Sequence, residues 1–493
     1  AREGQVPPCP ISKLAWDEVE LVPPGRRVCS PLLPLPERFE VGESANIYSD
    51  LWHAVNLMDL YFRCQRRPAG AILRVMPSAE KPKRINVRRP DIMEKVKAEV
   101  VMHYRSELVE HLRANGCTFA YGNTGIHLAK EFGFCYGVER AIDLAYAARR
   151  HFPKEQPVYI LGEIIHNPHV NEQIRDMGIT FLSGDHKAAD IDDLGEGDPV
   201  VIPAFGTEVN VNEMLRARGC TIIDATCGDV MSVWKRVRQN ARDQVTSIIH
   251  GKAWHEETKA TSSQAKAYEN GHYLVVFDLD DTDYVCRYIT KGGDPEAFLK
   301  KFDGAYSDGF DPDKHLNTIG LANQTTMLRS ETEEVQRRLS VAMAEKHGED
   351  ALDEHFRYFD TICGATQERQ DALRDLLNRP MDLLLVVGGY NSSNTSHLAE
   401  MGEEKLPTYF IKDVSEMESA ERLHHFLHHK HEMTVAENWL PLNGELTFGV
   451  TAGASCPNNI VEEIILRAYE LRGASADEVL GSINAESASD VAR

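Results

Sequence analysis

Asp-Ala-Thr-Cys-Gly at 224–228 and Asp-Thr-Ile-Cys-Gly at 360–364 decide the fold, because each sets a cysteine between a strand and a helix. Phe-Cys-Tyr-Gly at 134–137 makes a third such junction, without the aspartate. A thiol at a helix N-terminus faces the positive end of the helix dipole, which lowers its pKa. Three similar thiolates predict a soft metal centre held between three similar α/β units. The cysteines concerned are Cys135, Cys227 and Cys363.

An iron–sulfur cluster usually takes four cysteines, so three would leave one iron free for substrate. We therefore expect a catalytic centre. The alternative for any one buried cysteine is a small apolar filler. Cys456, in Ala-Ser-Cys-Pro just before another helical run, is the main competitor for a fourth ligand.

Composition excludes several classes of protein. The net charge of −22 over 493 residues argues against an electrostatic nucleic-acid binder. No apolar run approaches the roughly 18 residues that span a bilayer, so we expect no membrane segment. Ten dilute cysteines predict free thiols in a reducing compartment. We expect the cytoplasm or, if the acidic, proline-rich start is a processed remnant, the plastid stroma.

Residues 1–90 read as a leader of unknown role, partly disordered, with a short helix at 51–63 and a basic stretch at 63–90. It is interpreted as a regulatory extension, a docking surface for an electron donor or an upstream-extended reading frame. A helix capped by Asp91 is predicted to run to 114 and to stop at Asn115.

Strand-like and helix-like runs alternate after Cys117, which predicts an α/β fold with crossover units around parallel strands. The predicted strands are 158–161, 199–204, 221–223, 247–250, 273–277, 383–387, 409–411 and 446–450. The cysteine junctions divide the chain into a lead-in helix with the first strand and cysteine (91–135), three units (136–227, 228–362 and 363–472), and a tail (473–493) expected to be disordered. The stretch 278–313, rich in Asp and Gly, is read as a surface insertion in the second unit.

Two loops look built to bind an anion. Asn-Ser-Ser-Asn-Thr at 391–395 and Thr-Ala-Gly-Ala-Ser at 451–455 each follow an apolar strand and open a helix. Free amides and hydroxyls at helix N-termini are natural phosphate sites. Plain N-capping is the alternative for each loop taken singly.

Histidines and carboxylates follow other predicted strands. His166 lies in Glu-Ile-Ile-His-Asn, and His255 is followed by two glutamates. The segment Gln-Thr-Thr at 324–326 has the same position after a strand. Polar groups at the carboxyl ends of parallel strands mark the usual binding crevice, where imidazolium pairs with phosphate and a carboxylate relays protons.

Together these segments resemble the LytB family, the hydroxymethylbutenyl diphosphate reductases of the non-mevalonate isoprenoid pathway. The resemblance covers about residues 118–472 in family order. The matching segments are 134–141, 163–167, 224–227, 255–258, 323–326, 363–370, 391–394 and 451–455.

The resemblance implies three α/β units arranged trefoil-like around a central 4Fe–4S cluster, whose open iron binds the substrate hydroxyl. It also implies a small diphosphate substrate, isopentenyl and dimethylallyl diphosphate as products, and an electron donor such as ferredoxin or flavodoxin. Glu257 would donate the proton that lets the hydroxyl leave as water, assisted by Thr325. The implied cluster ligands are Cys135, Cys227 and Cys363, and the implied diphosphate-binding residues are His166, His255, Ser392, Ser393, Asn394 and Ser455.

The sequence departs from the better-known bacterial branch at two positions. Phe205 stands where that branch has a histidine, as in the plant and cyanobacterial branch, and we expect it to form an apolar wall of the pocket. The active-site loop reads His-Glu rather than His-Pro at 255–256. A cluster hydro-lyase and a zinc or iron–sulfur sensor module remain as alternatives on the residues alone.

Overall fold

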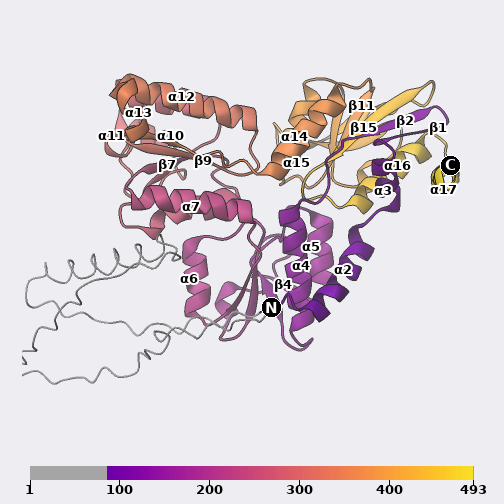
Figure 1. Ribbon diagram of the computed structural model, residues 1–493, viewed down its shortest axis with the longest axis horizontal. Coiled ribbons are helices and arrows are strands. Elements are labelled where there is room, and N and C mark those ends of the chain that lie inside the picture. The colour runs from indigo at the N-terminus through magenta and orange to yellow at the C-terminus, as the bar shows by residue number, and fades with distance from the viewer. Residues whose placement is uncertain (1–85, 492–493) are drawn as a thin grey trace, which may run out of the picture. The chain divides into compact units, whose positions relative to one another are not determined.

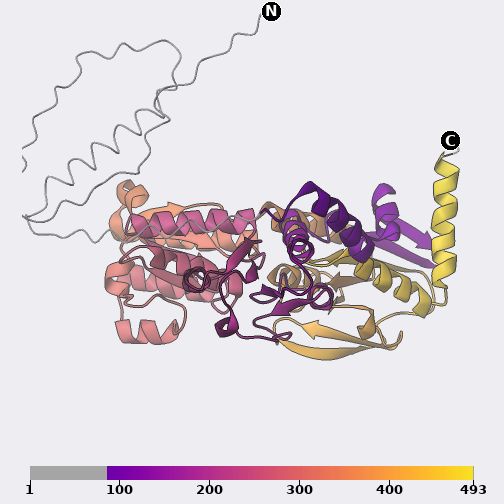
Figure 2. The ribbon, with the colours of Figure 1, turned by 90° about the horizontal axis from the view of Figure 1, so that it is seen from below.

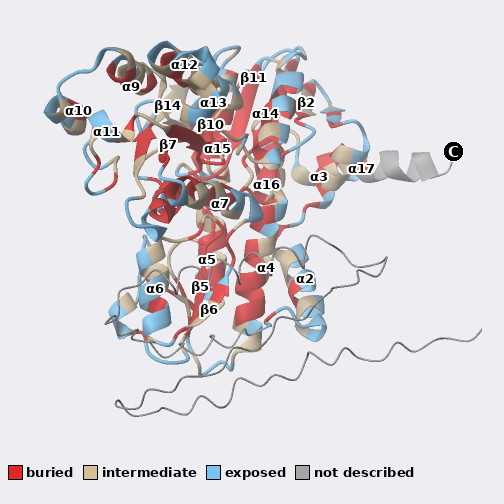
Figure 3. Cartoon of the chain, turned by 60° about the vertical axis from the view of Figure 1, so that its left-hand side comes forward, coloured by how far each residue is buried: buried red, intermediate tan, exposed pale blue. Residues whose placement is uncertain are grey.

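The computed structural model describes residues 86–491, which belong to one compact unit. The predicted helix at 51–63 and nearly all of the basic stretch lie outside the described residues. Within them the strands form three larger sheets, here called sheets I, II and III, and one two-stranded hairpin. Figure 1 shows the three sheets in three lobes, and Figure 3 shows buried strands under helices with exposed outer faces.

Sheet I is wholly parallel, in the order β4-β3-β5-β6. Sheet II is also parallel, in the order β10-β9-β7-β8. The bounds in sheet I are β3 Val158–Ile160, β4 Ile179–Phe181, β5 Pro199–Ile202 and β6 Thr221–Asp224; those in sheet II are β7 Thr246–His250, β8 Tyr273–Val276, β9 Ile319–Asn323 and β10 Phe356–Tyr358.

Sheet III has the order β1-β2-β15-β11-β12, and only the β1–β2 pair is antiparallel. Its strands are β1 Thr118–Tyr121, β2 Thr124–Leu128, β11 Leu383–Val387, β12 Thr408–Ile411 and β15 Leu446–Ala452; the separate hairpin is β13 Arg422–Leu427 with β14 Glu432–Glu437. The α/β prediction is confirmed. Sheet III draws two strands from the segment 91–135, which the sequence had set apart from the third unit.

Helices cover the sheets and bury apolar faces against them. They are α2 Pro90–Tyr104, α3 Glu107–Ala114, α4 Tyr136–His151, α5 Pro168–Asp176, α6 Val209–Ala217, α7 Gly228–Arg242, α8 Glu256–Ser263, α9 Leu279–Lys291, α10 Pro295–Lys301, α11 Pro312–His315, α12 Arg329–His347, α13 Leu352–His355, α14 Gly364–Leu377, α15 Ser393–Glu403, α16 Asn458–Leu471 and α17 Ala476–Val491.

The predicted single helix at 91–114 is two helices. The chain is extended at Arg105 and Ser106, and the Ser106 hydroxyl caps α3 by accepting from the Val109 N–H at 2.9 Å. The N-cap of α2 is Arg89 rather than Asp91, because Pro90 occupies the first turn. The break leaves α2 packed on α4, where the Tyr146 hydroxyl donates to that of Tyr104 at 3.0 Å.

The stretch 278–313 is not a surface insertion. It forms α9, α10 and α11, and Val285, Phe298 and Phe310 are buried in the core of the second unit. The tail was also wrongly expected to be disordered throughout, since Val479 and Ile483 of α17 are buried against the third unit. Figure 2 shows α17 at the outer edge of that lobe.

Candidate active site

The three candidate ligand cysteines occupy equivalent positions. Cys135, Cys227 and Cys363 are the N-cap residues of α4, α7 and α14, and each has extended backbone. Their amides tie them to neighbouring strand ends: the Cys135 N–H donates to the Ala454 carbonyl at 3.2 Å, and the Cys363 N–H to that of Thr325 at 3.3 Å. Each cysteine therefore begins a helix as predicted, whereas the preceding strands β2, β6 and β10 end at Leu128, Asp224 and Tyr358, so only Cys227 follows its strand closely.

The thiols of Cys135 and Cys227 point to the same space beside Gly137. A Cβ added at Gly137 would lie 2.6 Å from the Cys227 Sγ and 3.8 Å from the Cys135 Sγ. A side chain there would fill the space between the two sulfurs, so glycine keeps it open.

The three sulfurs are not close enough together to ligate one ion. Two thiolates on one zinc ion, each about 2.3 Å from it, lie no more than about 4.6 Å apart. Among the described residues, groups of ligand atoms all within 4.8 Å of one another do occur, but these cysteines do not form one. All three thiols are free. The donor set is therefore suited to a larger, sulfur-ligated group such as a 4Fe–4S cluster.

Burial opposes the predicted activation at two of the three thiols. Burial raises the pKa of Cys227, and it raises the pKa of Cys363 to about 12 in spite of hydrogen bonds from Thr366. Desolvation of the thiolate outweighs the helix dipole here. Deprotonation must then accompany metal binding, which releases the thiol protons.

Cys456 does not join the three cysteines. It is fully buried in the apolar core of the third unit, and its thiol donates to the Pro457 carbonyl oxygen at 3.6 Å. It has the role of a small core residue.

Glu257 is buried in the first turn of α8 and is held by Thr325. Its Oε1 accepts from the Thr325 N–H at 2.6 Å, and its Oε2 accepts from the Thr325 hydroxyl at 3.0 Å. Burial raises the pKa of Glu257 to about 7, although these two hydrogen bonds oppose the shift. The carboxyl group can therefore hold a proton near neutral pH and give it up.

His255 caps the same helix, and its tautomer follows from that contact. Its Nδ1 accepts from the Glu257 N–H at 3.1 Å, so a neutral ring carries its proton on Nε2. Burial lowers the pKa of His255 well below its ordinary value, and nearby His166 adds to the effect. The ring is thus a neutral N–H donor.

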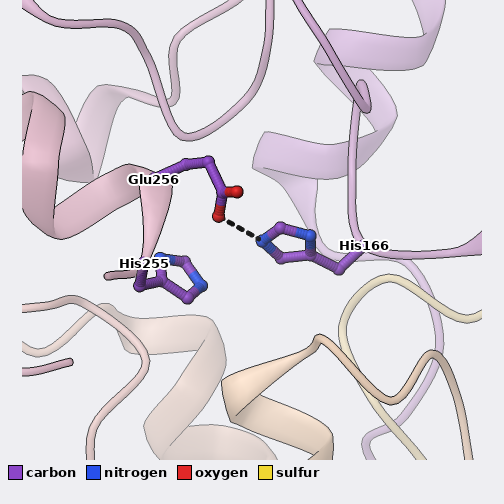
Figure 4. Close-up of side chains that lie close together, drawn as sticks. All are labelled: His166, His255 and Glu256. Carbon is purple, nitrogen blue, oxygen red and sulfur yellow. Dashed lines mark ion pairs between the residues drawn. The ribbon is translucent and has the colours of Figure 1, made fainter. Parts of the chain in front are cut away.

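His166 lies between two carboxylates and against an aromatic ring. Its Nδ1 is 2.8 Å from Glu163, and its Nε2 is 3.7 Å from the Glu256 carboxylate (Figure 4). Phe205 stacks on it with ring centroids 4.8 Å apart and planes 8° from parallel. The buried Nε2 has no hydrogen-bond partner, so it is available to a ligand.

Figure 4 also shows His255 beside His166 and Glu256. The ligand atoms of these three residues lie within 4.8 Å of one another, within reach of one bound ion or anion. The Glu256 side chain is 55% exposed, so it can turn away at little cost when an anion binds.

The two predicted anion loops lie side by side. Asn394 accepts from the Ala454 N–H at 3.0 Å, while its buried Nδ2 has no partner. The Ser392 hydroxyl caps α15 by accepting from the Thr395 N–H, and the Ser455 hydroxyl donates to the His166 carbonyl at 3.1 Å. Ser392 and Ser455 therefore have capping and linking roles in this structure, whereas Asn394 keeps a free donor.

A glycine allows the close approach of the His166 loop. A Cβ at Gly389 would lie 2.3 Å from the His166 carbonyl oxygen. Only glycine lets the end of β11 approach this loop of the first unit so closely.

Gln324 joins the second and third units, a role that the sequence did not single out. Its Oε1 accepts from the Lys252 N–H and the Thr258 hydroxyl, both at 3.1 Å. Its Nε2 donates to the hydroxyls of Ser393 at 3.0 Å and Thr326 at 2.8 Å. No local sequence pattern marks a side chain that bridges in this way.

A cavity of about 1020 Å³ opens beside these residues. His166, His255, Ser393 and Phe205 line it, so Phe205 lies on the wall of the cavity that the two histidines also face. The predicted proton donor and the remaining predicted binding residues are buried: Glu257, and Thr325, Ser392, Asn394 and Ser455.

The fold and the site define an α/β protein in which three units with mainly parallel strands bring cysteines, histidines and helix-capping loops close together. The chain belongs to the LytB family, whose model, described as LytB protein, matches residues 126–468.

Curated relatives carry the name 4-hydroxy-3-methylbut-2-enyl diphosphate reductase. The protein from Thermosynechococcus vestitus is 47% identical over 77% of this chain and 92% of its own length. That from a Synechococcus species is 46% identical over 75% of this chain and 91% of its own.

A solved reductase structure from Plasmodium falciparum, described as acting on E-1-hydroxy-2-methyl-but-2-enyl-4-diphosphate, is similar in fold. The two chains are 22% identical, with a TM-score of 0.51, and the match covers 70% of this chain and 89% of the solved chain. Among the described residues, no helix has the length and apolar character to cross a membrane.

Proposed function

We propose that this protein is an oxidoreductase that removes the hydroxyl group of 4-hydroxy-3-methylbut-2-enyl diphosphate, the last step of the non-mevalonate isoprenoid pathway. Two electrons and two protons are consumed, the C–O bond breaks, and the products are water with isopentenyl or dimethylallyl diphosphate. The observation that carries the proposal is the placement of the three cysteines around the buried Glu257. The thiols of Cys135 and Cys227 share the space beside Gly137, and the Cys363 N–H donates to the carbonyl of Thr325, the residue that holds Glu257.

Cys135, Cys227 and Cys363 would hold a 4Fe–4S cluster. The free thiols, their equivalent capping positions and the space kept open at Gly137 support this assignment. A cluster bound there supplies electrons one at a time and an iron with a free coordination position. A small redox protein such as ferredoxin or flavodoxin would deliver those electrons.

The diphosphate would be bound where the two histidines meet the helix N-termini. His255 offers a neutral Nε2–H, and His166 offers an Nε2 without a partner. Asn394 adds an unpartnered amide donor, and Ser392, Ser393 and Ser455 lie at the two loops beside it. Neutral and charge-assisted donors at helix N-termini suit phosphate oxygens. Phe205 would form the apolar wall of this pocket.

Glu257 would give a proton to the departing hydroxyl, because hydroxide is a poor leaving group and water a good one. Thr325 holds both of its carboxylate oxygens, which fixes the direction in which the proton is offered. Thr325 is thus a positioning residue in this proposal.

The test is anaerobic purification with iron and sulfide analysis, then an assay with the hydroxymethylbutenyl diphosphate and a chemical reductant. We expect about four irons and four sulfides per chain, and product formation only with reductant. Turnover without reductant would instead favour a hydro-lyase. A colourless zinc protein, or a cluster with no spectral change on adding substrate, would favour a sensor module.

A further inference from the structure

Another group of side chains of the types that ligate metals lies at the turn between β13 and β14. The turn contains His428, His429, Lys430 and His431, and the hairpin closes at the Leu427–Glu432 pair. Glu403, the last residue of α15, lies next to this turn. Ligand atoms of Glu403, His428 and His429 are all within 4.8 Å of one another.

The distances fit one ion rather than a direct contact. The His428 Nδ1 is 3.7 Å from the Glu403 Oε1, which is too long for a hydrogen bond. Two ligands that each lie about 2.0–2.2 Å from one zinc ion are separated by at most about 4.4 Å. The observed gap therefore leaves room for an ion between the two groups.

The His428 nitrogen also lacks another partner. Its Nδ1 is shielded from solvent and makes no hydrogen bond in the part of the chain that the structure describes. The His428 and His429 rings are 5.5 Å apart, with planes at 81°, so they approach the same space from two directions. A buried polar atom without a partner is uncommon and calls for an explanation.

We propose that Glu403, His428 and His429 bind a divalent transition-metal ion of the zinc type, with a water molecule in the fourth position. Two imidazoles and one carboxylate suit zinc, nickel or copper better than magnesium or calcium, which prefer oxygen ligands. The ion ties the hairpin turn to the end of α15, the helix whose first turn carries Ser393 and Asn394. His428 and His429 line the same cavity as His166, so the ion adds positive charge to the cavity wall.

The experiment uses the full, cluster-loaded chain under anaerobic conditions. Zinc affinity is measured by equilibrium dialysis, and the zinc ligands are measured by X-ray absorption at the zinc edge, which does not detect iron. We expect about one zinc per chain with nitrogen and oxygen neighbours and an imidazole signature. His428→Ala, His429→Ala and Glu403→Gln should each weaken binding about tenfold or more.

His424→Ala is the matched control, because His424 lies on the same hairpin but pairs with Glu418 at 3.0 Å. Its zinc affinity should equal that of the wild type, and iron content should be unchanged in all four variants. The proposal is overturned if the chain binds no zinc, if sulfur neighbours appear, or if all three ligand variants bind as the wild type does. These outcomes do not depend on the reductase activity, so the two proposals can fail separately.

Discussion

Glu257 and Thr325 form a two-point contact in which one residue engages both oxygens of the carboxyl group, at 2.6 Å and 3.0 Å. Thr325 lies just after the end of β9, whereas Glu257 lies in the first turn of α8. The contact therefore joins the two loops that follow β7 and β9, which are neighbouring strands of sheet II. The side chain of Glu256, which precedes Glu257, instead points toward His166 (Figure 4) and is 55% exposed.

Glu257→Gln should lower kcat by roughly 10²–10⁴-fold, because positioned proton transfer typically contributes that much. Cluster content and substrate binding should be retained. Glu256→Gln should change kcat little, since its carboxylate is largely exposed and lacks the Thr325 contact. Steady-state kinetics at equal iron content measure both variants. The reverse ranking would contradict the assignment of the proton donor.

The pH profile should report the same carboxyl group. Glu257 donates only when protonated, and its pKa is about 7, so kcat should fall as pH rises through about 7. Glu257→Gln should lack this limb. Unfolding restores the ordinary pKa of 4.5 and releases a proton between about pH 4.5 and 7, so the folded state loses stability as pH rises through that window. The thermal stability of the glutamine variant, relative to wild type, should therefore be higher at pH 8 than at pH 6.

Replacing any one of the three ligand cysteines by serine should abolish the cluster or leave it labile. Cys456→Ser is the control: it lies in the apolar core and should keep full iron content, even if the buried hydroxyl costs stability. Iron and sulfide analysis measures the outcome. Full iron and activity in a Cys135, Cys227 or Cys363 variant would refute the ligand set.

His255→Ala should raise KM strongly and leave cluster content unchanged. A hydrogen bond to a charged phosphate is worth roughly 1.5–3 kcal/mol, which corresponds to more than a tenfold change in affinity. His166→Ala should behave similarly, since its Nε2 lies free at the cavity. A KM within about twofold of wild type in the His255 variant would mean that the diphosphate binds elsewhere.

Gln324→Ala should destabilise the protein, because it leaves buried groups of Thr258 and Ser393 without their partner. The expected loss is about 1–3 kcal/mol, measured by denaturant unfolding of the cluster-loaded chain. Substitution of Glu421, an exposed residue just before β13, offers a neutral comparison. Equal unfolding midpoints for both variants would show that the bridge contributes little.

Deleting residues 1–85 should leave the cluster and the activity with a chemical reductant intact, because the matched motifs all lie later in the chain. The cut must spare Val87, which is buried against the first unit. Loss of both cluster and activity would contradict this expectation. Failure with a protein electron donor alone would indicate a docking role for the removed segment.

The sequence predicted the helix starts at the cysteines well because they are local. A cysteine and the amphipathic run after it are adjacent in the chain, and Cys135, Cys227 and Cys363 are indeed helix N-caps. The neighbouring loops at Ser392 and Ser455 were found for the same reason. Glu257 and Glu256 could be told apart only through the family resemblance, yet burial now separates them.

Properties that depend on distant residues were missed. The thiol pKa values were expected to fall, but burial raises those of Cys227 and Cys363. The acidic composition of 278–313 hid apolar residues at helical spacing, such as Val285 and Ile289, that complete a core. The segment 91–135 was expected to hold one strand and to stand apart from the third unit, but it holds two, and β2 pairs with β15 at the other end of the described chain.

That pairing has a consequence for biogenesis. The side chain of Asn123, between β1 and β2, donates a hydrogen bond to the carbonyl of Gly444, which is 321 residues away. The Cys135 N–H likewise donates to the carbonyl of Ala454. A ribosome must release nearly the whole chain before the first cysteine gains its final surroundings, so long-range strand pairing makes this step slow. Insertion of iron and sulfide is therefore expected to follow completed synthesis.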